Sequence, residues 1–136
     1  MNTVEKGALA EAIAVKEMIK RGYDILTPNT HAVPFDFVAH KDGELVKVQV
    51  KGKVPVKGKL RDIKLIRNPF QNTKGTKVPR PYTSKDFDIM LVVDLDTEIV
   101  YTIPFDEFEG KNMTLRLDTP KNGQVKGIRL AEDFLL

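Results

Sequence analysis

The sequence predicts an α/β fold of the α+β kind, with a mixed central sheet and flanking helices. Three observations support this prediction. Residues 3–21 have the periodicity of a helix, residues 34–51 read as two strands joined by a tight turn, and residues 87–95 are a continuous apolar run. Such a run is typical of a strand that is buried on both faces. The helix is therefore expected to pack on the sheet, with its edge directed toward the hairpin.

The predicted helix begins at a cap formed by Asn2 or Thr3 and ends at Gly22, because glycine favours the left-handed position after a helix. Apolar residues recur at steps of three or four, which is the spacing of one buried face. That face is expected to hold Val4, Ala8, Ala12, Val15 and Ile19, widened by Leu9 and Ile13.

The hairpin within residues 34–51 turns at Asp42-Gly43, a pair that suits the positive φ angles of a type I′ turn. With these two residues as the loop, Lys41 faces Glu44. Side chains alternate between the two faces of a strand. The polar face then carries Asp36, Gln49 and Lys51, and the apolar face carries Phe35, Phe37, Val48 and Val50. A sheet does not bury its core with a carboxylate, an amide and an ammonium group, so the polar face predicts a functional site.

Other elements follow from turn residues and apolar patterns. Strands are expected over 23–27, 60–67, 98–103 and 113–117, and a helical turn over 104–108. Irregular segments are expected over 52–58, 68–85 and 119–127, the second being a long loop of the kind that is usually functional or disordered. The apolar end of residues 129–136 is expected to dock on the core or on another subunit.

Positive charge is concentrated between residues 47 and 80. This segment holds eleven basic residues and one acidic residue, Asp62, although the whole chain has a net charge of only +3. The pattern indicates either a solvated basic loop or a nucleic-acid site. Because the segment starts at the polar hairpin, we favour DNA. The expected DNA contacts are Lys53, Lys57, Lys59, Arg61, Lys64, Arg67, Gln71, Asn72, Lys74, Lys77, Arg80 and Tyr82. The ring of Tyr82 would serve equally well to pack this segment onto the domain.

Composition excludes several functional classes. A chain of 136 residues with 41% hydrophobic residues predicts one domain, residues 1–136, with one core. Without cysteine, neither disulfides nor thiolate zinc sites can form, and His31 and His40 are too few for a histidine-built metal site. No apolar run approaches the ~20 residues of a membrane span, and the start lacks the pattern of a signal peptide. A cytoplasmic protein without membrane partners is expected.

A family resemblance rests on the same residues. Pro34-Phe35-Asp36, followed after twelve residues by Gln49-Val50-Lys51, resembles the PD-(D/E)XK nuclease motif, with Gln49 where the second acid usually stands. The helix that carries Glu11 is similar to the upstream helix of that superfamily. The chain looks most like the group I intron-encoded homing endonucleases of this type, which also have glutamine in that slot, and it is similar to the archaeal Holliday junction resolvases. The resemblance implies a restriction-endonuclease-like fold with an αβββαβ-type core.

The resemblance also implies catalytic roles for Asp36, Gln49, Lys51 and Glu11. Magnesium, for which manganese can substitute, would be held by Asp36, Glu11, the carbonyl of Val50 and the amide of Gln49, since this ion prefers a few oxygen ligands together with water. Lys51 would position the attacking water. From the residues alone, Glu11 has an alternative, which is to face solvent in a charge cluster with the nearby Lys16 or Glu17.

Three functions remain open. The first is a sequence-specific double-strand DNA endonuclease, the second a Holliday junction resolvase, and the third a non-catalytic DNA-binding protein of nuclease ancestry. The basic segment contains arginine, asparagine and glutamine, the residues that best hydrogen-bond base edges, which favours the first. Cutting both strands symmetrically implies a homodimer, and the similar homing enzymes imply a homotetramer.

Overall fold

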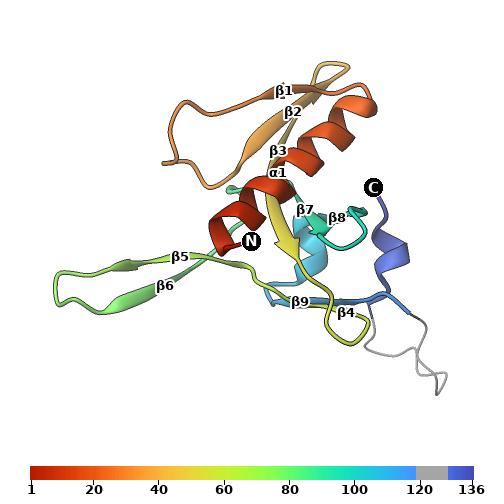
Figure 1. Cartoon of the computed structure of the whole chain (residues 1–136). Helices are drawn as coiled ribbons and strands as arrows, with labels where there is room; N and C mark the ends of the chain where they lie inside the picture. The colour runs from red at the N-terminus through yellow and green to blue at the C-terminus, as the bar shows by residue number, and fades with distance from the viewer. Residues whose placement is uncertain (119–128) are drawn as a thin grey trace.

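A five-stranded mixed sheet lies at the centre of the molecule (Figure 1). The computed structural model describes residues 1–118 and 129–136, and of residues 67–71 it describes the backbone alone. The strand order is β1 (Asp24–Leu26), β2 (Phe37–Lys41), β3 (Glu44–Lys53), β7 (Ile89–Asp94) and β8 (Val100–Pro104). Only the β3–β7 pair is parallel, so the predicted mixed α+β sheet is confirmed.

Two apolar clusters fill the two faces of this sheet. Helix α1 (Thr3–Lys20) covers one face, where it packs on Phe37, Ala39, Val48, Val50, Leu91 and Val93. The opposite face packs against a smaller layer made of β4 (Lys59–Ile63), β9 (Met113–Arg116) and the 3-10 helices η1 (Phe105–Phe108) and η2 (Ala131–Phe134). The polar ends of β2 and β3 emerge at the border of this second layer.

The hairpin forms as predicted, with one exception. Asp42 and Gly43 have φ angles of 51° and 81°, and Lys41 pairs with Glu44. The exception is Phe35, which packs against the cluster opposite α1. The prediction for Phe35 was wrong because the strand β2 begins only at Phe37, so strict alternation does not extend back to residue 35.

Helix α1 starts as predicted at Asn2, whose side chain and that of Glu5 form a reciprocal capping box. The predicted buried face was right in part, because Ile13 is buried and Leu9 and Val15 pack against the cluster beneath the helix, and wrong at its other positions. Val4 and Ile19 are 80% and 56% exposed, whereas the buried residues are Ala10, Ile13, Ala14 and Met18. Ala10 lies next to Gly52 of β3, so the packing of the two elements, and not the number of apolar residues, selects the buried face.

The connection from β3 to β7 differs from an αβββαβ pattern. Residues 54–88, whose backbone is fully described, contain strands and no α-helix. The predicted strand over 60–67 is split into β4 and β5 (Ile66–Gln71). The predicted long loop was wrong, because β5 pairs with β6 (Lys77–Pro81) as an antiparallel ribbon. Each ribbon strand has one unpaired edge, which is where proline is tolerated in a strand.

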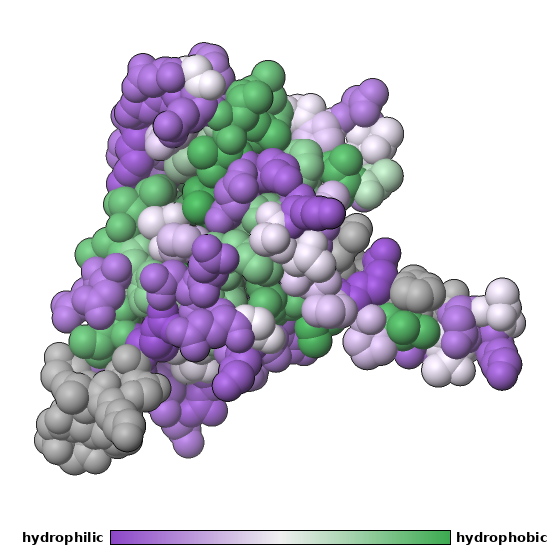
Figure 2. Space-filling model, turned by 180° about the vertical axis from the view of Figure 1, so that it is seen from behind, coloured by the Kyte–Doolittle hydropathy of each residue, from purple (hydrophilic) through white to green (hydrophobic). Residues whose placement is uncertain are grey.

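The β5–β6 ribbon extends away from the sheet (Figure 1). Seen from behind, it protrudes well beyond the rest of the surface, and hydrophilic residues gather toward its tip (Figure 2). It forms a separate two-stranded sheet, so it presents two open faces to any partner.

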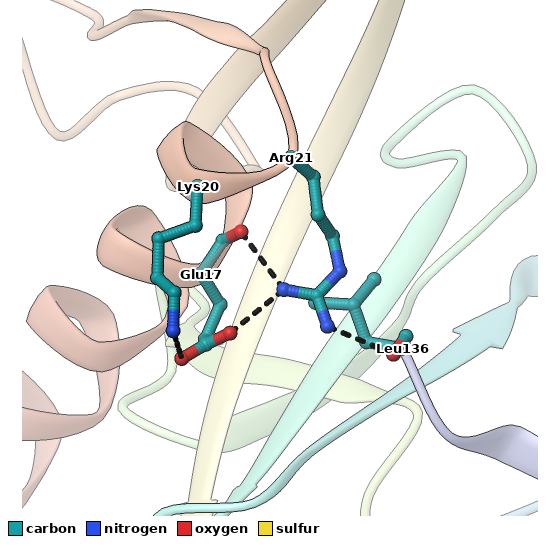
Figure 3. A network of polar contacts seen from close by, with 4 residues as sticks. All are labelled: Glu17, Lys20, Arg21 and Leu136. Atoms are coloured by element: carbon teal, nitrogen blue, oxygen red, sulfur yellow. Dashed lines mark hydrogen bonds and ion pairs between the residues drawn. The ribbon is translucent and has the colours of Figure 1, made fainter.

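The C-terminal segment docks on the core, as one of the two alternatives predicted. The amide of Leu136 donates to the carbonyl of Val100 at 3.1 Å, and Phe134 packs against the cluster opposite α1. Arg21 donates to the carboxylate of Glu17 at 2.7 Å and to the carbonyl of Leu136 at 3.0 Å (Figure 3). This network ties the end of α1 to the last residue. The predicted loop at 119–127 lies outside the described residues.

Among the described helices, none is both long and apolar enough to cross a membrane.

Candidate active site

Asp36 is fixed by backbone contacts to β3. Its amide donates to the carbonyl of Val48 at 2.8 Å, and its Oδ2 accepts from the amide of Val50 at 2.7 Å. The side chain is half-buried, and this burial raises the pKa of the carboxyl, partly offset by the Val50 amide and by the charge of Lys51. One carboxylate oxygen is thus anchored to the strand, while the other is left for a ligand.

Lys51 lies on the same face of the sheet, two residues after Gln49. Its Nζ is 5.9 Å from the centroid of the Tyr82 ring, which is the outer limit of a cation–π contact. Burial lowers the pKa of Lys51, against the opposing effect of Asp36. The Tyr82 ring is only 8% exposed and meets Phe87 edge-on at 5.1 Å. Tyr82 therefore packs the base of the ribbon onto the core, and its ring lies beside the ammonium group of Lys51.

Gln49 is one of the two buried polar side chains among the described residues. Its Nε2 donates to the carbonyl of Val50 at 3.3 Å. In this geometry the amide nitrogen supports the carbonyl that was predicted as a metal ligand. Gln49 adds no charge to the site, whose charged side chains include Asp36, Glu11, Lys51 and Arg80.

Glu11 reaches the site from α1. It is half-buried and lines the same hollow as Asp36. Burial raises the pKa of the Glu11 carboxyl, the nearby Asp36 raises it further, and His31 lowers it. The alternative of a charge cluster on the helix belongs instead to Glu17, which pairs with Arg21 and Lys20 (Figure 3).

A close approach between α1 and β3 makes this placement possible. A Cβ atom on Gly52 would lie 2.7 Å from the Cβ of Ala10, a distance that real atoms do not tolerate. Ala10 directly precedes Glu11, and Gly52 directly follows Lys51, so this contact sets the spacing between the two functional side chains. The expectation that residue 52 begins an irregular segment was wrong, because β3 continues to Lys53. A glycine inside a strand, which often marks a close approach, was the signal in the sequence.

Gly52→Ala is expected to destabilise the protein by about 1–3 kcal/mol, the usual cost of overpacking a core, and to lower cleavage by moving Glu11 away from Asp36. Chemical denaturation and cleavage rates would measure both effects. Gly7→Ala is the matched control on α1, because a Cβ there meets nothing within 4 Å. Gly7→Ala should leave cleavage unchanged and stabilise the helix, by up to about 1 kcal/mol. Wild-type stability and cleavage in Gly52→Ala would contradict the close-approach account.

Two polar hollows flank Asp36. The first, of about 290 Å³, is lined by Glu11, Thr27, Pro28, Thr30, His31, Val33, Phe35 and Asp36. The second, of about 230 Å³, is lined by His31, Val33, Pro34, Phe35, Asp36, Gln49, Lys51, Arg80 and Tyr82. The predicted catalytic residues are therefore brought together around one carboxylate, with Glu11 on one side and Lys51 on the other. His31, to which the sequence assigned no site, borders both hollows.

Comparison with known proteins shows the family and the fold of this chain. The whole chain, residues 1–136, matches the family model described as PD-(D/E)XK endonuclease. The chain belongs to this family. The endonuclease is 32% identical over 105 residues to Protein 5.3 of Escherichia phage T7, an alignment that covers 77% of this chain and 82% of that protein. It also superposes on the bacterial homing endonuclease I-Ssp6803I with a TM-score of 0.78 and 26% identity, over 99% of this chain and 89% of the other. The predicted family and fold are confirmed.

PD-(D/E)XK nucleases generally use divalent metal ions, and the site of this endonuclease fits one. Asp36 and Glu11 are two half-buried carboxylates whose pKa values are both raised by burial, an arrangement that a cation would relieve. Among the described residues, no three His, Cys, Asp or Glu side chains gather closely enough to hold a metal by themselves. The two carboxylates, completed by waters and substrate phosphates, are a ligand set that a divalent cation can use.

The predicted DNA-contacting residues of the endonuclease differ in how exposed they are to solvent. Lys57, Arg61, Lys64, Lys74 and Lys77 are exposed, while Lys53, Lys59, Asn72 and Arg80 are half-buried. The side chains of Arg67 and Gln71 lie outside the described residues. Asn72 Oδ1 accepts from the amides of Lys74 and Thr76, both at 2.9 Å, so it shapes the ribbon turn. Lys53 Nζ donates to the carbonyl of Asp62 at 2.9 Å, which ties β3 to β4.

Proposed function

We propose that the endonuclease cuts double-stranded DNA at a specific sequence in a metal-dependent reaction. The observation that carries this proposal is the position of the catalytic face at the foot of the basic ribbon. Arg80 of β6 and Tyr82 just after it line the same hollow as Asp36 and Lys51. DNA held by the ribbon would thus deliver a backbone phosphate to the catalytic side chains.

The oxygen donors proposed for the metal are the carboxylates of Asp36 and Glu11, the backbone carbonyl of Val50 and the amide oxygen of Gln49. Magnesium, or manganese in its place, would neutralise phosphate charge and supply an activated water when bound there. Asp36 keeps its position because the Val50 amide holds one of its oxygens. Gln49 supports the Val50 carbonyl from the same strand.

Lys51 is proposed to orient and polarise the attacking water. Its ammonium group is held between the charge of Asp36 and the face of Tyr82, and it faces the second hollow. A half-buried amine with a lowered pKa gives up a proton more readily than an exposed lysine, which suits a group that must assist deprotonation of water. Within this proposal, Glu11 and Asp36 share the metal on the opposite side.

The ribbon is proposed to read base edges. The major groove of B-DNA admits a two-stranded β-ribbon, and side chains alternate between its two faces. Lys74 and Lys77 are exposed near its tip, and no acidic residue occurs between residues 66 and 81. Such a ribbon can both neutralise phosphates and place polar side chains in the groove. Cutting both strands with one such centre per chain calls for a homodimer or a homotetramer.

Replacing Lys74 and Lys77 together by alanine is expected to flatten the salt dependence of DNA binding. Each phosphate contact contributes about −0.9 to the slope of log K against log salt concentration, so the slope should become less steep by almost two. Titrations at several salt concentrations would measure it. Lys16→Ala/Lys20→Ala, with both lysines exposed on α1, is the charge-matched control and should keep the wild-type slope. An unchanged slope in the ribbon variant would mean that the tip does not touch the DNA backbone.

The substrate is tested by offering the purified protein with Mg²⁺ two kinds of DNA. One is a randomised duplex library, and the other is a set of four-way junctions with unrelated sequences. We expect cleavage of a particular duplex of about twenty base pairs or longer, with each critical mismatch costing roughly 1–3 kcal/mol. Equal cutting of all junctions without selection from the library would instead support a junction resolvase. Binding without cleavage of either substrate would support a non-catalytic DNA-binding protein.

A further inference from the structure

The site described so far serves one side of the reaction. Lys51 acts on the attacking water, and Asp36 and Glu11 provide the carboxylates of a metal site. When the phosphodiester breaks, negative charge also develops on the departing sugar oxygen. If attack comes from the hollow that holds Lys51, Glu11 is the catalytic side chain that lies toward that oxygen, and an ionised carboxylate cannot donate a hydrogen bond to it.

The geometry places the leaving oxygen in the other hollow. Displacement at phosphorus is roughly in line, so the attacking and leaving oxygens lie on opposite sides of the phosphorus. Attack from the Lys51 hollow, past Asp36, directs the leaving oxygen toward the hollow of Glu11, Thr27, Thr30 and His31. Glu11 has no hydrogen to donate when ionised, so the leaving oxygen needs a donor from the loop that follows β1.

His31 is the donor best placed for this role. Of the side-chain N–H and O–H donors lining the first hollow, it alone also lines the second, so it stands at the passage between them. It lies near enough to Glu11 to lower the pKa of that carboxyl. A local hydrogen bond shapes the loop around His31. The Oγ1 of Thr30, just before His31, accepts from the amide of Ala32, just after it, at 3.3 Å. The imidazole is exposed, so DNA can reach it.

We propose that His31 donates a hydrogen bond to the leaving sugar oxygen of the cleaved phosphodiester. This inference rests on the proposed nuclease function and adds a catalytic residue to it. Water, oriented by Lys51, attacks phosphorus and releases one proton to solvent. The bond from phosphorus to the sugar oxygen breaks, and its electron pair stays on that oxygen. The imidazole N–H stabilises the developing charge, and a proton from solvent completes the sugar hydroxyl.

The test compares two versions of the duplex selected from the library, one natural and one with sulfur in place of the bridging leaving oxygen. A sulfur leaving group carries negative charge readily and needs little help from a donor. His31→Ala is expected to slow single-turnover cleavage of the natural duplex by about 10²–10³-fold, the cost of losing one donor to a developing oxyanion. It should cut the sulfur duplex at the wild-type rate. His31→Asn keeps an N–H donor and should recover part of the loss.

His40→Ala is the control, because His40 is the other histidine of the chain and its Nδ1 lies 3.7 Å from Asp24, outside both hollows. It should cut both duplexes like the wild type. Equal slowing of both duplexes by His31→Ala, or no slowing of the natural one, would overturn the role of His31 and leave the nuclease function standing. A wild-type protein that cuts neither duplex would instead contradict the nuclease function, and with it this inference.

Discussion

Asp36→Asn is expected to abolish cleavage and to leave the protein folded and more stable than the wild type. Loss of activity should exceed the roughly 10–100-fold that removing an outer partner of a metal ligand costs, because Asp36 is proposed to hold the metal directly. The amide oxygen of asparagine can still accept from the Val50 amide, so the end of β2 keeps its anchor.

The stability gain follows from the direction of the pKa shift. Burial raises the pKa of Asp36 above its ordinary value of 3.8, so the folded state binds this proton more tightly than the unfolded state does. Stability contributed by this group is therefore lost as pH rises from 3.8 through the folded pKa, and at neutral pH the buried carboxylate is a net cost that asparagine removes. Thermal unfolding at pH 7 should give a higher midpoint temperature for Asp36→Asn than for the wild type.

Asp24→Asn provides the comparison for Asp36→Asn. The Asp24 side chain is 88% exposed on β1, so its replacement should change neither cleavage nor the unfolding temperature. If Asp36→Asn cut DNA within about twofold of the wild type, a difference worth under 0.5 kcal/mol of barrier, Asp36 would have no place in the catalytic site.

Lys51→Ala is expected to slow the chemical step by about 10²–10⁴-fold, the range typical of groups that assist proton transfer. DNA affinity should change little, because Lys51 is half-buried beside Tyr82 and the phosphate contacts are proposed for the exposed lysines of the ribbon. Single-turnover rates and binding constants, measured separately, would distinguish an effect on the chemical step from an effect on DNA affinity. Lys47→Ala, on the same strand and face, is the matched control and should keep the wild-type rate. A loss of affinity that accounts for the whole loss of activity would make Lys51 a binding residue.

The sequence was sufficient to predict the hairpin and its chemistry. The Asp42-Gly43 turn sets the register of β2 and β3, and alternation along β3 puts Gln49 and Lys51 on one face. Asp36 precedes β2 and is held beside them by hydrogen bonds to the backbone of Val48 and Val50. The assumption that side chains alternate between the two faces of the strand failed at Phe35, which precedes β2. The helix was predicted in extent but not in orientation, because its sequence carries two apolar stripes and the choice between them depends on tertiary packing.

Long-range features were harder to predict. The contact of Ala10 with Gly52 joins residues far apart in the chain, and no local pattern specifies it. The ribbon was predicted as a loop because Pro69, Gly75 and Pro79 are residues typical of loops. In a free two-stranded ribbon they occupy edges and a turn instead. His31 was passed over for a similar reason, since its importance depends on hollows that form only when the loop folds against Glu11 and Asp36.

Anomalous diffraction from Mn²⁺ tests the central claim most directly. Crystals of the Lys51→Ala variant, bound to the selected duplex in uncut form and grown with Mn²⁺, would show where the metal sits. The account predicts a peak about 2.1 Å from a carboxylate oxygen of Asp36, a distance typical of small divalent ions, and beside the phosphate that the wild type cuts. A metal peak at that phosphate without contact to Asp36, or a cut phosphate lying away from Asp36 altogether, would contradict it.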